Sequence, residues 1–223
     1  MRAPILASAL TTALLFLSGA QAGSVAARAP APKCGPAQFT SSLYQLNEDT
    51  NARRNVSFQS AKDSLGRTML STSVNGVSAP ATAKFEFVPC NSTVLPSARY
   101  ESGANGYSYG VIRPVGQPTR CLTASSMTKN STLRAFVNAP CATIDTVSKL
   151  APQWFISHYY TFPTTGNKVE VDLNGDSNFT TTGYWIYNNV AAGNARLFET
   201  SWDQYGNASL PYRLFMSQTF KSG

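Results

Sequence analysis

Short apolar runs separated by turns constrain the fold of this chain more than any other feature. From Phe39 onward, runs of four or five residues rich in aromatic and β-branched side chains alternate with turn clusters such as NG, GQP, NGD and AGN. No long apolar stripe recurs with the 3.6-residue period of a helix. In VEVDL (169–173) apolar and acidic residues alternate, which is the period of a half-buried strand. The predicted strands are 43–46, 85–88, 109–113, 133–137, 153–157, 169–173, 184–187 and 212–216.

The number and spacing of these runs predict one all-β domain, either a closed barrel or a β-sandwich. Three of the strands each follow a proline, and their hydrophobic anchors, Phe85, Trp154 and Leu214, lie 69 and 60 residues apart. This spacing predicts three related units around a common core, which is a pseudo-threefold arrangement. The chain is long enough for one core of this kind.

The first 22 residues have the pattern of a secretory signal peptide. Arg2 supplies a positive charge, residues 5–17 are mostly apolar, and the tripeptide AQA before Gly23 is a small-x-small cleavage site. The apolar stretch is shorter than the roughly 20 residues that a membrane-spanning helix needs. We therefore expect the mature chain to be secreted to the extracellular space. Residues 23–33, rich in Ala and Pro, are predicted to be a disordered lead-in to a single domain over 34–223.

The four cysteines all follow the signal sequence, which indicates disulfide bonds formed in an oxidising compartment. Four cysteines allow three pairings, and closure of the loops most local in sequence favours Cys121–Cys141 together with Cys34–Cys90. In a loop-entropy model, the short loop stabilises the fold by about 3 kcal/mol and the long one by about 4 kcal/mol.

Asn-x-Ser/Thr sequons recur along the whole chain. In a secreted protein each sequon marks a surface position able to carry an N-linked glycan, so we expect a glycoprotein. None of these asparagines should lie deep in the core. The sequons begin at Asn55, Asn91, Asn130, Asn178 and Asn207.

Basic residues outnumber acidic ones, 18 to 11, but they are scattered along the chain. Arg53 and Arg54 form the only adjacent basic pair. A nucleic-acid-binding surface is a clustered basic patch, so no nucleic-acid binding is expected. Weak attraction to an acidic polysaccharide or to a membrane surface is compatible with the net charge.

Residues suited to catalysis or metal binding are few. The single histidine, His158, excludes multi-histidine metal sites. DLNGDSN (172–178) is similar to the start of a calcium loop, but Ser177 and Gly183 stand where that loop needs Gly and Glu, so a turn is expected. A Ser-His-Asp hydrolase would have to use His158, and no nucleophile-elbow motif is present. We therefore expect no metal, no cofactor and no catalytic residue.

The middle of the chain resembles one repeat of a known lectin family. The elements that carry the resemblance are, in order, Cys121-Leu122, LRAFV (133–137), Cys141 and Gln153-Trp154-Phe155. This order resembles a ricin-B-type (QxW) β-trefoil lectin, most clearly over residues 105–160. The resemblance implies a barrel closed by three such repeats. Two departures are that Trp154 follows the glutamine directly and that Thr123 stands where the family has a sugar-binding aspartate.

The resemblance implies a sugar site in the third repeat instead. A loose register lays Leu122 on Val171, so that Thr123 meets Asp172. Asp172 would then accept hydrogen bonds from sugar hydroxyls, an aromatic ring would stack on the sugar, and an amide would complete the site. The residues implied are Asp172, Trp185 or Tyr187, and Asn188 or Asn194. The alternative is that Asp172 lies on the solvent side of an edge strand and that Trp185 belongs to the core.

These features predict a secreted, N-glycosylated, non-catalytic protein that binds carbohydrate in the manner of a lectin. One alternative keeps the fold but makes it a protein-interaction or inhibitor module, whose long loops contact an extracellular protein. The other alternative is a small secreted hydrolase centred on His158, which would then lie in a cleft beside a carboxylate or a hydroxyl. The sequence carries no signal of an oligomeric state.

Overall fold

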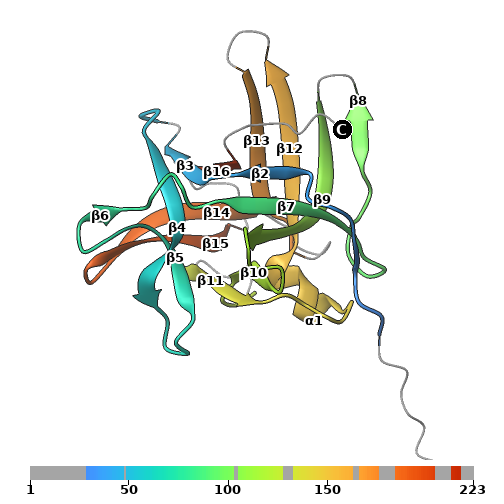
Figure 1. Ribbon diagram of the computed structural model, residues 1–223, viewed down its shortest axis with the longest axis horizontal. Coiled ribbons are helices and arrows are strands. Elements are labelled where there is room, and N and C mark those ends of the chain that lie inside the picture. The colour runs from blue at the N-terminus through green and yellow to red at the C-terminus, as the bar shows by residue number, and fades with distance from the viewer. Residues whose placement is uncertain are drawn as a thin grey trace, which may run out of the picture.

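Strands make up almost all of the regular structure (Figure 1). The structure, a computed structural model, describes residues 29–47, 49–102, 105–127, 133–162, 166–175, 184–203 and 212–216. Its strands are β1 (Lys33–Cys34), β2 (Phe39–Ser41), β3 (Leu43–Asn47), β4 (Arg53–Lys62), β5 (Thr68–Val74), β6 (Val77–Ser78), β7 (Phe85–Asn91), β8 (Tyr100–Ser102), β9 (Asn105–Pro114), β10 (Arg120–Ala124), β11 (Arg134–Pro140), β12 (Phe155–Phe162), β13 (Gly166–Leu173), β14 (Tyr184–Ala192), β15 (Ala195–Asp203) and β16 (Tyr212–Met216). A short helix, α1 (Val147–Leu150), and a 3₁₀ turn, η1 (Ala151–Gln153), connect β11 to β12.

Seven of the strands close a barrel. β2 and β3 are one extended stretch interrupted at Ser42, and β2 pairs with β7. The ring continues through β9, β12, β13 and β16, each antiparallel to the one before, and β16 returns to β3. Because the last strand pairs with the first, this part of the sheet has no open edge. The prediction of an all-β domain is therefore confirmed, and of the two predicted architectures the barrel is present and the sandwich is wrong.

Three hairpins lie outside the ring and contact one another. The hairpins are β4–β5, β10–β11 and β14–β15. One strand of each pairs with the other two hairpins: β5 with β11, β11 with β15, and β15 with β5. Each hairpin is preceded and followed along the chain by ring strands, β3 and β7, then β9 and β12, then β13 and β16. The order ring strand, hairpin, ring strand therefore occurs three times.

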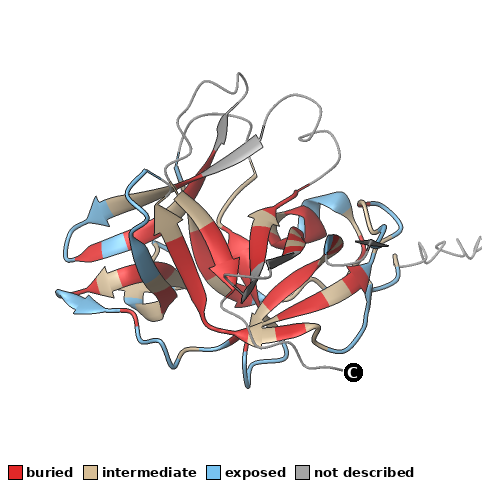
Figure 2. Ribbon diagram, turned by 90° about the horizontal axis from the view of Figure 1, so that it is seen from above, coloured by how far each residue is buried: buried red, intermediate tan, exposed pale blue. Residues whose placement is uncertain are grey.

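The main core lies between the ring and the three hairpins. Phe136 of β11 sits among three other rings, with centroids 6.0 Å from those of Phe155, Tyr187 and Phe198. The ring strands contribute alternate residues, as Val169, Val171 and Leu173 of β13 do. Burying an apolar side chain of this size stabilises the fold by about 1.5–3 kcal/mol. Figure 2 shows buried residues along the central strands and exposed ones mainly in the turns.

A second cluster packs around Trp154, which is fully buried. Its members include Val88, Val111 and Leu150, together with one cysteine from each disulfide. The indole Nε1 donates a hydrogen bond to Pro96 O at 2.7 Å. Both predicted disulfides, Cys34–Cys90 and Cys121–Cys141, are confirmed. Both disulfide bonds therefore pack against this second apolar cluster.

Two expected boundaries shift by a few residues. The predicted strand 153–157 begins at Phe155, because Pro152 starts a 3₁₀ turn and the Gln153 amide bonds back to Pro140 O and Ala142 N. The predicted disordered lead-in is wrong for its last residues. Pro30 O accepts a hydrogen bond from Asp145 N at 2.7 Å, and Lys33 pairs with β7. The predicted signal peptide lies outside the described residues.

The described sequons lie where a glycan could be carried. Asn91 is exposed at the end of β7, and Asn55 is partly buried on β4. Neither is a core residue, as expected. Asn130, Asn178 and Asn207 lie outside the described residues.

Candidate functional site

The register that equates Thr123 with Asp172 is not reproduced. Thr123 lies on β10, a hairpin strand paired with β11. Asp172 lies on β13, a ring strand between β12 and β16. The two segments share an alternating pattern because both are strands with one buried face, but the chain places them in different parts of the fold. Asp172 therefore has no structural equivalent at Thr123.

Tyr187 cannot stack on a ligand, because it is a core residue with 2% of its surface exposed. Its ring packs on Phe198 with centroids 5.2 Å apart. Its hydroxyl accepts a hydrogen bond from the buried Leu173 N at 2.7 Å. The prediction that Tyr187 binds sugar is wrong for this reason. The side chain of Trp185 lies outside the described residues.

Tyr187→Phe is expected to cost about 1–3 kcal/mol of the free energy of unfolding, because the Leu173 N–H would lose its hydrogen-bond partner inside the core. Chemical denaturation of both proteins measures this. Tyr212→Phe is the matched control, since Tyr212 is only partly buried and its hydroxyl forms no hydrogen bond within the described part of the chain. Equal stability of the Tyr187→Phe variant and the parent would contradict the assignment.

The two predicted amides do not join a site around Asp172. Asn188 is partly buried on β14, opposite Glu199 of β15. Asn194 lies in the turn at the far end of the same hairpin, where its amide donates to Asn75 Oδ1. Of the described members of the predicted site, Asp172 and Tyr187 are in contact through a hydrogen bond, whereas Asn194 lies at the turn and contacts Asn75 instead.

Asp172 instead belongs to a charged group on the ring strands. Burial, together with the neighbouring Glu170 carboxylate, raises the pKa of Asp172 to about 7, although Arg213 and a hydrogen bond with Tyr187 act in the opposite direction. Glu170 is buried and its Oε1 lies 2.6 Å from Arg213 Nη1. A carboxyl that titrates near neutral pH is often functional, but ion-pair groups of this kind also occur in structural roles.

His158 of β12 is directly opposite Glu170 on the neighbouring strand β13. Burial lowers the pKa of His158, and the Glu170 carboxylate partly offsets this. On its other side His158 is paired with Tyr107, with ring centroids 6.2 Å apart. A carboxylate neighbour is what the hydrolase alternative expects, but His158 does not line the two recesses described below.

One groove formed by described residues lies where β7 separates from β9, and we call it the β7–β9 groove. β7 pairs with residues 110–114 of β9, and β8 pairs with residues 105–107 of the same strand. Ser108 and Tyr109 therefore lie between the segments that pair with β7 and with β8. The groove has a volume of about 460 Å³. Its polar and aromatic lining residues are Lys33, Gln38, Asn91, Ser97, Arg99, Ser108 and Tyr109.

Close backbone contact and covalent bonding hold the walls of this groove. A Cβ on Gly110 would lie 2.0 Å from Val88 O, so only glycine allows β7 and β9 to approach here. Beyond this point Cys90 turns away to pair with Cys34 of β1, and the disulfide joins the two. The groove is therefore largely preformed, as ligand sites usually are.

Asp145 anchors the loop at the groove rim. Its carboxylate accepts hydrogen bonds from Ser92 Oγ at 2.5 Å, Thr93 N at 2.6 Å and Thr93 Oγ1 at 2.9 Å. Burial alone would raise the pKa of Asp145, but these hydrogen bonds outweigh it and hold the pKa below its ordinary value. This loop follows Asn91 directly and so fixes one side of the groove.

The polar groups of the groove are incompletely satisfied within the protein. Ser108 Oγ and Gln38 Oε1 are buried and have no hydrogen-bond partner among the described residues. Gln38 as a whole is partly exposed and lines the groove. Tyr109 is half-buried and touches the Tyr107 ring edge-on, with centroids 5.9 Å apart. Tyr100, which is 51% exposed, stacks on Tyr107 in turn.

No family model and no curated protein matches this chain. Within the described residues, no helix is long and apolar enough to cross a membrane. The same residues contain no group of three or more His, Cys, Asp or Glu side chains placed to hold a metal ion.

Sequence reasoning missed the β7–β9 groove. Its lining comes from four separate segments of the chain, and no motif connects them. The one signal available was the run YSYG (107–110), in which two tyrosines alternate with small residues at the start of the predicted strand 109–113.

Proposed function

We propose that this protein is a secreted carbohydrate-binding protein and that the β7–β9 groove is its sugar site. The observation that carries the proposal is the lining of the groove, where a half-exposed tyrosine ring stands beside amides, hydroxyls and cationic donors. Sugars present both an apolar ring face and many hydroxyl groups, so they suit a site that combines an aromatic wall with convergent polar groups.

The fold that we propose for it is a β-trefoil of the ricin-B type. In support, a closed ring carries three hairpins that pair with one another, and the order ring strand, hairpin, ring strand recurs three times. The Cys121–Cys141 disulfide joins the start of the β10–β11 hairpin to the residue just after it, as the resemblance implies. Trp154 packs beneath that hairpin in the same cluster as Cys121.

Individual groups in the groove have distinct roles in this proposal. Tyr109 supplies the face on which a sugar ring stacks. Ser108 and Gln38 exchange hydrogen bonds with sugar hydroxyls, which relieves the cost of leaving buried polar atoms without partners. Lys33 and Arg99 add donors and favour sugars that carry a carboxylate. Secretion is supported by the two disulfides, which persist in oxidising compartments.

The experiment is a glycan array followed by calorimetry on the best ligand, with the parent and two variants of Tyr109. Tyr109→Ala removes the ring and is expected to weaken binding at least tenfold, about 1.4 kcal/mol. Tyr109→Phe keeps the ring and is expected to stay within threefold of the parent. Asp172→Ala serves as the comparison at the site implied by the resemblance and should leave affinity unchanged.

Two results would overturn the proposal. One is an array on which no oligosaccharide binds. The other is a ligand whose affinity is the same for Tyr109→Ala as for the parent, with both proteins folded by circular dichroism.

A further inference from the structure

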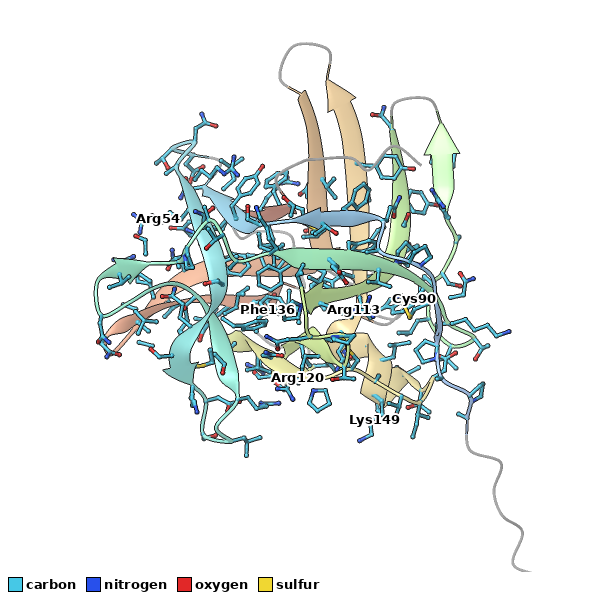
Figure 3. All side chains as sticks on the ribbon, in the orientation of Figure 1. Arg54, Cys90, Arg113, Arg120, Phe136 and Lys149 are labelled. Carbon is cyan, nitrogen blue, oxygen red and sulfur yellow. A yellow bond between two sulfur atoms is a disulfide. The ribbon has the colours of Figure 1, made fainter. Side chains whose placement is uncertain are left out.

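We propose that a second recess of this protein binds an oxyanion, the sulfate or phosphate group of a ligand. The recess has a volume of about 420 Å³ and lies between the start of β4, the β5–β6 turn and β15. Six of its lining residues carry the argument: Arg53, Arg54, Thr72, Ser73, Ser78 and Arg196. We call it the arginine recess. Figure 3 shows the labelled Arg54 and the groove residue Cys90 on opposite sides of the molecule.

Strand pairing brings the recess residues together from distant parts of the chain. Arg196 of β15 is directly opposite Ser73 of β5, and Ser73 is directly opposite Ser78 of β6. A guanidinium and two hydroxyl-bearing residues therefore stand in one row across three strands. Arg53 enters from β4, and its guanidinium carbon lies 3.6 Å from the centre of the Tyr44 ring, which orients it.

Three arginines elsewhere in the described part of the chain have acidic partners, whereas those of the recess have none there. Arg67, Arg113 and Arg213 pair with Asp63, Glu86 and Glu170. No carboxylate lines the recess, and none of its three guanidinium groups forms an ion pair within the described part of the chain. Like charges placed close together repel, and a bound anion removes this repulsion.

The chemistry of the lining selects an oxyanion. A guanidinium presents planar N–H donors that match two oxygens of a sulfate or phosphate at once. The hydroxyls of Ser73 and Ser78 add shorter-range hydrogen bonds to the same oxygens. The lining is mainly polar, so an apolar ligand finds little surface there.

Hydrogen bonds between two turns hold one wall of the recess in place. Asn75 and Gly76 have left-handed backbone angles, φ 53° and φ 76°, at the β5–β6 turn. Asn75 N donates to Asn194 O at 2.7 Å, and the Asn194 amide donates to Asn75 Oδ1. The β5–β6 turn is thereby tied to the turn of the β14–β15 hairpin, which carries Arg196 on its second strand. This preorganisation reduces the entropy cost of closing around an anion.

The test is calorimetric titration with sodium sulfate, sodium phosphate and a sulfated oligosaccharide, at constant ionic strength adjusted with sodium chloride. The parent is compared with the double variant Arg54→Gln/Arg196→Gln, which leaves the Arg53–Tyr44 contact intact. Lys62→Gln/Lys149→Gln is the control, because both lysines are exposed and lie outside the recess. Replacing them removes the same number of positive charges as the arginine double variant. All proteins carry Asn55→Gln, since Asn55 lines the recess and begins a sequon.

We expect the parent and the lysine control to bind at least one of the probes, and the arginine double variant to bind it at least tenfold more weakly. Tighter binding of the oligosaccharide than of both salts identifies an anion carried on a polysaccharide, whereas equal binding identifies the free anion. Binding equal in the parent and the arginine variant overturns the proposal, as does the absence of binding to all three probes. Tyr109→Ala should leave the affinities for sodium sulfate and sodium phosphate unchanged, so the two sites can fail independently.

Discussion

Replacing Trp154 with alanine is expected to lower the free energy of unfolding by about 3–5 kcal/mol. The indole is fully buried in the second apolar cluster and contacts the region of both disulfides. Its backbone carbonyl also accepts hydrogen bonds from Asn174 N at 2.8 Å and Gly175 N at 3.2 Å, so a collapse at this position would disturb the end of β13. The cavity left by the indole cannot close fully, since the two disulfide bonds restrict movement of the residues that line it.

Two further variants separate the contributions of Trp154. Trp154→Phe keeps most of the volume but leaves Pro96 O without its donor, so an intermediate loss of about 1–3 kcal/mol is expected. Leu65→Ala, at a side chain that is 75% exposed, should change stability by less than about 0.5 kcal/mol. Urea denaturation followed by circular dichroism measures all three. A loss below about 1 kcal/mol for Trp154→Ala would show that the cluster does not support the fold.

Asp172→Asn is expected to stabilise the protein at neutral and alkaline pH. The pKa of Asp172 is about 7 in the folded protein against an ordinary value of 3.8, because burial and the Glu170 charge disfavour the carboxylate. The folded state therefore binds the proton more tightly than the unfolded state between these values. Stability must then fall as pH rises from about 4 to about 7, by an amount on the order of 2–4 kcal/mol. Asparagine does not titrate, so the variant lacks this loss.

Stability measured from pH 4 to pH 8 by thermal or chemical unfolding checks the sign. The variant and the parent should be similar near pH 4, and the variant should be the more stable above pH 7.

Asp145→Asn is expected to change stability in the opposite direction. Its carboxyl has a lowered pKa, so it contributes stability above its ordinary pKa that is lost as pH falls. That variant should be less stable than the parent at neutral pH, with a difference that shrinks toward low pH. A parent whose stability rises steadily through pH 4–7, unchanged by Asp172→Asn, would contradict the charge assignment.

The strands that could be predicted from the sequence are those buried on one face. All eight predicted runs coincide with strands, although the run 133–137 begins one residue later than expected and the run 153–157 two residues later. β4 (RRNVSFQSAK) and β15 (ARLFETSWD) were not predicted, because polar residues interrupt their apolar positions. In β4 only Val56 and Ser57 are buried, so pairing with β3 and β5 holds this segment as a strand. Their pairing partners, more than their own composition, make them strands.

The sites follow a different rule. The adjacent pair Arg53-Arg54 was visible in the sequence, but its significance depends on Arg196, which arrives from the last hairpin. From the sequence, Tyr187 was a candidate for stacking on a ligand. In the structure it lies in the core, because the hairpin that carries it turns this side chain inward. Tyr109 was predicted to lie on a strand, but whether its ring faces a neighbour or a groove depends on where β7 leaves β9.

The sequence by itself determined the properties that arise between residues close in the chain. These are the alternation that makes strands, the turns that separate them, and the pairing of cysteines across the most local loops, here Cys121–Cys141 and Cys34–Cys90. Only the tertiary structure decided which strands meet, which aromatic rings are buried, and which charged and polar groups face a common space. The physical reason is that these properties depend on long-range pairing, such as the return of β16 to β3, and a local pattern is compatible with several such pairings.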